Sequence, residues 1–135
     1  MRFRLSPLLF LAVLPACSGG TDARPPVPAR LDIVSGSNQD GVYGQALSQP
    51  LVVRVSDASG KSVPNATVLW TASNGTLSPT TSVTDTSGRA STIWTLGQNA
   101  VDQAVAAAVS GVAPVIFAAK GRPPVPAVIH SCETN

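Results

Sequence analysis

The chain is poor in the residues from which most catalytic sites are built. It has one histidine, His130, and two cysteines, and charged residues make up only 12% of its 135 positions. A lone histidine forms neither a Ser-His-Asp triad nor a multi-histidine metal site. The seven acidic residues are scattered, mostly in turn sequences, and no glycine-rich phosphate loop follows a strand pattern. We therefore expect a protein that is not an enzyme and that holds no cofactor and no metal.

An excess of charge of one sign is also lacking. The formal net charge is +2, with nine basic and seven acidic residues. Two of the basic residues, Arg2 and Arg4, lie in the N-terminal leader, so the remainder has seven of each sign. A neutral chain lacks the excess of basic residues with which proteins bind the phosphate backbone of nucleic acid.

Aromatic residues are scarce, at 4%, although apolar residues reach 44%. The core must therefore be built from valine, alanine, leucine and a few rings. A charged fraction near half of the usual ~25% is typical of an exported β domain when Thr, Ser, Gly and Pro are plentiful. After the leader is subtracted, the chain has room for one domain of about 100 residues.

The N-terminus has the pattern of an export signal. Two arginines precede an apolar run over residues 5–16, which is shorter than the ~20 residues that a membrane-spanning helix needs. The run ends in Leu14-Pro15-Ala16-Cys17, which resembles the lipobox of bacterial lipoproteins. That resemblance implies cleavage before Cys17, acylation of its thiol and attachment to a membrane through the lipid. The alternative is an ordinary signal peptide with a chance cysteine.

The residues around the lipobox extend this expectation. Ser18 after the cysteine, by analogy with lipoproteins, favours the outer membrane of a two-membrane bacterium. Residues 17–28 would be the tether, first flexible and then proline-rich. With Cys17 acylated, Cys132 has no disulfide partner, and we expect it to be a free thiol in the tail.

Period-2 alternation predicts the fold. Residues 66–73 alternate apolar and mostly polar positions around Trp70, and similar patterns recur at 51–56, 89–97, 104–109 and 115–119. The alanine-rich run at 104–108 has helix propensity, but its length and its flanking turns favour a strand. Seven or eight short strands separated by turns predict an all-β antiparallel sandwich. The predicted core contains Val53, Val55, Val68, Trp70, Trp94, Leu96 and Phe117.

Two kinds of segment between the predicted strands lack the alternating pattern. Residues 39–49 read as a loop, with Val42 and Tyr43 as an edge segment. Asp57 and Asp85 each begin an Asp-x-Ser-Gly sequence. Because aspartate at the first turn position can bond its own backbone, we interpret both as turn-forming residues rather than calcium ligands.

Several of these segments together resemble the bacterial Ig-like domain of group 1, the repeat of invasin and intimin. The matching segments are Pro50 to Val55, Asp57-x-x-Gly60-x-x-Val63-Pro64, Val68-x-Trp70, Gly75-Thr76-Leu77, Thr84-Asp85-x-x-Gly88-x-Ala90 and Trp94 to Gly97. The resemblance covers about residues 28–121. It implies an immunoglobulin-like sandwich at the cell surface, often in adhesins, and no catalytic residues. Host-receptor binding is not carried over, because the barrel and lectin-like domain of invasin and intimin do not fit in this chain.

A repeated hexapeptide bears on domain organisation. Arg-Pro-Pro-Val-Pro-Ala occurs at residues 24–29 and again at 122–127, about one Ig-like domain apart. Residues 122–135 therefore read either as the shortened start of a second repeat or as a proline-rich tail. The expected organisation is a signal peptide at 1–16, the tether at 17–28, the Ig-like domain at 29–121 and this tail.

These inferences predict a non-enzymatic, exported envelope lipoprotein that displays one Ig-like domain as an adhesive or structural module. Its partners would be the membrane, through the lipid on Cys17, and a protein or glycan that the sequence does not identify. Two alternatives remain: a periplasm-facing module that binds a protein or glycan during envelope assembly, and the remnant of a shortened tandem array.

Overall fold

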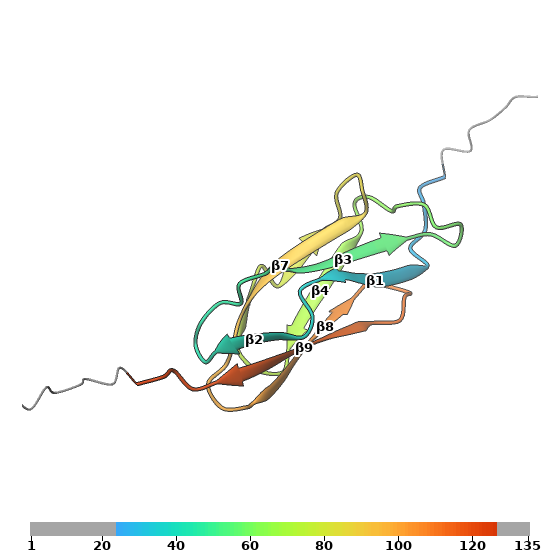
Figure 1. Ribbon diagram of the computed structural model, residues 1–135. Helices are drawn as coiled ribbons and strands as arrows, with labels where there is room; N and C mark the ends of the chain where they lie inside the picture. Colours follow the sequence, from blue (N-terminus) through green and yellow to red (C-terminus); the bar gives the residue numbers. More distant parts are fainter. Residues whose placement is uncertain (1–23, 127–135) are drawn as a thin grey trace, which may run out of the picture.

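The computed structural model describes residues 24–126, which form a sandwich of two β-sheets (Figure 1). One sheet has four strands in the order β1-β3-β7-β5, and the other has five in the order β2-β9-β8-β4-β6. The expected all-β, immunoglobulin-like fold is confirmed. The bounds of the strands are β1 Arg30–Ser35, β2 Gln39–Val42, β3 Leu51–Ser56, β4 Thr67–Ala72, β5 Thr76–Ser78, β6 Thr81–Val83, β7 Arg89–Thr95, β8 Asp102–Ala108 and β9 Val115–Arg122.

The leader, the lipobox with Cys17, and residues 127–135 with His130 and Cys132 lie outside the described residues. All strand pairings fall between Arg30 and Arg122. The chain enters at the start of β1 and leaves at the end of β9, at opposite ends of the sandwich (Figure 1). We call these the entry end and the exit end.

The core lies between the two sheets, because alternate side chains of each long strand point inward. The burial pattern of β7 alternates along its length, and β8 does the same. The alanine-rich segment is therefore a strand, as expected. The seven residues predicted for the core are all buried here: Val53, Val55, Val68, Trp70, Trp94, Leu96 and Phe117.

Residues 24–126 form nine strands rather than seven or eight, and one of the pairings is parallel. The short strand β5 was not expected from the sequence, and β2 lies in the segment read as a loop with Val42 and Tyr43 as an edge segment. β2 pairs with residues 119–122 of β9. Its sequence, Gln-Asp-Gly-Val, lacks apolar alternation, so backbone pairing and packing decide its structure. At Gly41 a Cβ atom would lie 2.6 Å from Leu96 and 2.7 Å from Leu47, so a side chain there would displace both leucines.

The Asn-Gly turn after β4 forms as expected, with Gly75 at φ +87°. It does not close a hairpin, because β4 belongs to the five-stranded sheet and β5 to the four-stranded sheet. The chain crosses between the sheets here, and the Trp94 indole Nε1 donates to the Asn74 carbonyl oxygen at 3.1 Å.

Candidate functional site

The outer face of the five-stranded sheet is apolar across its middle strands. Leu69 on β4 and Ile116 on β9 point away from the core and are 51% and 56% exposed. Between them lies β8, where Ala108 is in register with Leu69 and Ala106 with Ile116. A sheet that is apolar on both faces is normally covered on both. We call this surface the outer apolar face; it comprises Leu69, Ala104, Ala106, Ala108, Ile116 and Ala118.

A row of charged residues borders this face at the exit end. Lys120 on β9 is in register with Asp40 on β2 and with Asp102 on β8. Cross-strand partners share one side of a sheet, so the three charges alternate in sign across the strands. They surround a hollow of about 310 Å³, whose lining also includes Asn38, Gln103, Ala118 and Ala119. The outer apolar face is therefore bordered at one end by a hollow with charged residues around it.

Gln103 holds the loop beside this hollow, and the sequence reasoning missed it. Its side chain is 2% exposed, and its Oε1 accepts a hydrogen bond from the Gly97 amide at 2.8 Å. Its Nε2 donates to the carbonyl oxygens of Gly97 and Ala100, both at 2.9 Å. The sequence did hold a signal for it: Val105 and Ala107 point inward, and strand alternation places Gln103, two residues before Val105, on the same side.

Two turns of the same design lie at the entry end. Asp57 Oδ1 accepts hydrogen bonds from the Ser59 hydroxyl at 2.6 Å and from the amides of Ser59 and Lys61, both at 2.9 Å. Asp85 Oδ1 repeats this arrangement, with the Ser87 hydroxyl again at 2.6 Å. Both aspartates therefore organise turns, as expected, and in the part of the chain described no group of three His, Cys, Asp or Glu side chains could hold a metal ion.

These hydrogen bonds act on the carboxyl groups. The Ser59 hydroxyl, followed by backbone amides, lowers the pKa of Asp57 below its usual value. The Ser87 hydroxyl and the Arg89 amide lower the pKa of Asp85 in the same way. Donors directed at a carboxylate favour its charged form. Both groups therefore remain anionic at neutral pH.

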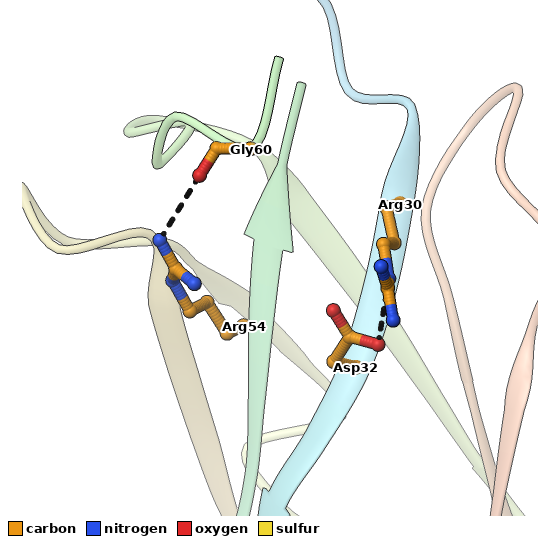
Figure 2. A network of polar contacts seen from close by, with 4 residues as sticks. All are labelled: Arg30, Asp32, Arg54 and Gly60. Carbon is orange, nitrogen blue, oxygen red and sulfur yellow. Dashed lines mark hydrogen bonds and ion pairs between the residues drawn. The ribbon is translucent and has the colours of Figure 1, made fainter. Parts of the chain in front are cut away.

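Arginines lie on the outer face of the four-stranded sheet near these turns. Arg30 Nε donates to Asp32 Oδ1 at 3.0 Å within β1. Figure 2 shows Arg54 on β3 directed away from this pair, toward the Gly60 carbonyl oxygen, to which Nη2 donates at 3.3 Å. The same Nη2 also donates to Ser62 Oγ at 3.1 Å. The guanidinium group of Arg54 is thus fixed by uncharged acceptors.

The residues singled out in the sequence do not form a binding site. The seven core residues are scaffold and lie inside the sandwich, and Cys17 lies outside the described residues. Along residues 24–126 no helix is long and apolar enough to cross a membrane. Sequence patterns did not bring together the outer apolar face, the charged residues at the exit end or the arginines at the entry end.

An intimin fragment is among the solved structures that are similar to this chain. A C-terminal 282-residue fragment of intimin, solved in complex with the intimin-binding domain of the translocated intimin receptor, is 28% identical with a TM-score of 0.55. That match covers 70% of this chain and 33% of the fragment. No curated protein sequence matches the chain.

Two further solved structures share the fold alone. The Yersinia pseudotuberculosis adhesin InvE has a TM-score of 0.56 at 18% identity, over 72% of this chain and 33% of InvE. Domains 4 and 5 of the S-layer protein SbsC have a TM-score of 0.51 at 12% identity, over 71% and 53% of the two chains. This chain thus spans about a third of the intimin fragment and of InvE.

The family model for the bacterial Ig-like domain (group 1) matches residues 44–117. That stretch is more than half of the chain and runs from the loop after β2 into β9. The resemblance read from the sequence is therefore confirmed: the chain belongs to the bacterial Ig-like domain (group 1) family.

Proposed function

We propose that this protein is a non-enzymatic envelope lipoprotein that displays one Ig-like domain as an adhesive or structural surface module. The lipobox at Cys17 supports the anchor, since acyl chains on a cysteine hold an otherwise water-soluble domain at a membrane. Intimin, which is similar over this domain, was solved with a protein receptor domain bound. A contact role with a protein partner therefore fits the family and the surface.

The outer apolar face is the observation that carries this proposal. Its two large side chains are Leu69 and Ile116, and the residues of β8 between them are alanines. Because alanine side chains are small, a partner can approach the sheet backbone closely. Burying such a surface drives protein association. The adjoining row of Asp40, Lys120 and Asp102 would fix the orientation of a partner through charge complementarity.

The positions of the chain ends support display. Entry and exit lie at opposite ends of the sandwich (Figure 1), so a tether attached at the entry end leaves the exit end directed away from its anchor. The outer apolar face runs along the side of the domain between these ends.

Protease shaving of intact cells tests the surface location. We expect externally added protease to remove the Ig-like domain, while a periplasmic control protein survives. Survival of the domain would instead favour the periplasm-facing alternative. Labelling with radioactive palmitate tests the anchor separately: the label should be present in the native chain and absent after Cys17→Ser.

Substitution tests the contact surface. Leu69→Lys combined with Ile116→Lys should abolish binding of the cells or the purified protein to its partner. Ile93 is 51% exposed on the outer face of the other sheet, so Ile93→Lys is a matched control. Equal loss of binding in both variants, or in neither, would contradict a role for the outer apolar face.

A second reading, the remnant of a tandem array, is favoured by one observation. The hexapeptide that precedes β1 recurs at the end of β9, where a linker to a further domain would begin. Sequencing the gene beyond its stop codon tests this reading. Further Ig-like repeats in any frame would support it, and their absence would favour a single displayed module.

A further inference from the structure

Three arginines gather on the outer face of the four-stranded sheet at the entry end. Arg54 on β3 is in register with Arg89 on β7, and Arg30 begins the neighbouring strand β1. The residues that flank them along the strands are buried, so alternation directs all three outward. We call Arg30, Arg54 and Arg89 the arginine row.

The row places like charges side by side. Two cations directly opposite each other across a β-ladder repel and destabilise the pairing. The residue in register with Arg54 on its other side is Asp32, but the Asp32 carboxylate contacts Arg30, and Arg54 is directed away from it (Figure 2). Within residues 24–126 the Arg30–Asp32 pair is the one ion pair, and the Arg89 side chain makes no hydrogen bond there.

The remaining acids at the entry end are already engaged. Asp57 and Asp85 each direct Oδ1 at three donors within their own turns. Five basic residues face three acidic ones at this end, so it is net positive: Arg24, Arg30, Arg54, Lys61 and Arg89 against Asp32, Asp57 and Asp85. At the exit end, Asp40 and Asp102 balance Lys120 and Arg122.

A phosphate group fits this arrangement. Guanidinium groups bind phosphate oxygens through paired N–H donors, and an anion between Arg54 and Arg89 would remove their mutual repulsion. Arg54 is held in place by Gly60 and Ser62, so its side chain is already ordered. Little conformational entropy is then lost when an anion binds.

We propose that the arginine row binds the phosphate groups of anionic lipids at the membrane surface to which the chain is tethered. This choice of phosphate source rests on the proposed lipid anchor at Cys17. Twelve residues separate Cys17 from Arg30, and even a fully extended chain of that length reaches only about 45 Å. The entry end is therefore the part of the domain that the anchor holds nearest to the lipid headgroups. Contact there would orient the domain and leave the outer apolar face, on the other sheet, free for a partner.

Vesicle binding tests the proposal without the acyl chain. The protein is prepared from residue 17 with Cys17→Ser, which retains the whole sandwich and the tail. At low ionic strength we expect it to sediment with vesicles that contain phosphatidylglycerol and not with vesicles of phosphatidylcholine alone. Added salt should release it, since surface charges are screened. Arg89→Gln should weaken this binding about fivefold, and Arg54→Gln with Arg89→Gln should weaken it further.

Lys120→Gln with Arg122→Gln removes the same number of charges at the exit end and serves as the matched control. The proposal holds if this pair keeps vesicle binding while the arginine-row variants lose it. Arg89→Gln breaks no hydrogen bond of the side chain, so the melting temperature of this variant should not fall.

No binding to anionic vesicles, or an equal loss in both double variants, overturns the proposal. Equal displacement by inorganic phosphate and by lipid phosphate at matched ionic strength would identify a free-phosphate site and overturn the membrane assignment. Because these proteins carry no lipid, failure here is distinguishable from failure of the palmitate labelling.

Discussion

Trp70 and Phe117 pack against each other in the core, with ring centroids 5.8 Å apart and ring planes at 46°. They come from β4 and β9, which are not neighbours, because β8 lies between them. Ala107 is in register with Trp70, and Val105 with Phe117, so the rings approach diagonally across β8. The small side chain of Ala107 leaves room for the indole. This tilted pair links three strands of one sheet and faces the other sheet.

Replacing Trp70 by alanine should lower the free energy of unfolding by about 3–5 kcal/mol, because a large buried side chain is lost and a cavity remains. The variant also loses the hydrogen bond from Trp70 Nε1 to Ser82 Oγ at 2.7 Å. Urea denaturation followed by circular dichroism measures the difference. Leu69→Ala, on the exposed side of the same strand, should change stability much less. A loss below about 1 kcal/mol for Trp70→Ala would contradict its place in the core.

Gly75→Ala should destabilise the domain more than Gly60→Ala does. Both glycines have similar positive φ values, +87° and +88°, so an alanine Cβ is strained by the backbone at either site. At Gly75 that Cβ would also clash with the Thr95 carbonyl oxygen, whereas at Gly60 nothing lies within 4 Å. The difference in melting temperature between the two variants measures the effect of the steric clash. Equal melting temperatures would show that the segment crossing between the sheets at Gly75 accommodates a Cβ atom without loss of stability.

Gln103→Leu should cost at least about 2 kcal/mol although it keeps the size and burial of the side chain. The Gly97 amide and two carbonyl oxygens would lose their buried partner, and an unsatisfied buried polar group costs about 1–3 kcal/mol. Hydrogen exchange should show faster exchange at Gly97 than in the wild type. Gln98→Leu, at an exposed position two residues after the core residue Leu96, is the control. Unchanged exchange at Gly97 would contradict a structural role for the amide.

Acid should destabilise the two Asp-x-Ser-Gly turns. Hydrogen bonds lower the pKa of Asp57 and of Asp85 in the folded protein, so each carboxylate stabilises the fold. This contribution is complete above the unfolded pKa of about 3.9 and is lost as the pH falls through the lower folded pKa. Melting temperatures measured from about pH 7 to about pH 2 should therefore fall mainly below about pH 4.

Substitution identifies the source of that acid sensitivity. Asp57→Asn with Asp85→Asn should flatten the decline, because the amides do not titrate. Ser59→Ala with Ser87→Ala should flatten it in part, since the hydroxyls are the strongest influence on each pKa. An unchanged slope in both double variants would assign the acid sensitivity to other carboxyl groups.

Local sequence patterns predicted much of the sandwich, because alternation is a property of each strand by itself. The facing of β4 followed from the pattern around Trp70, and the aspartate turns followed from side-chain chemistry within five residues. The seven predicted core residues lie where their strand periodicity places them. The family resemblance depended on the same local motifs in order along the chain.

Features that depend on distant partners did not follow from the sequence. β2 is a strand because β9 is beside it, and its own residues have little strand propensity. Asp40 meets Lys120 only because β2 pairs with β9, and Arg54 meets Arg89 only because β3 pairs with β7, strands that are far apart in the chain. By itself the sequence determined which residues alternate and turn, and hence the fold class and the family. Only the tertiary structure decided which outward side chains meet, because register is set by the packing of the whole sandwich.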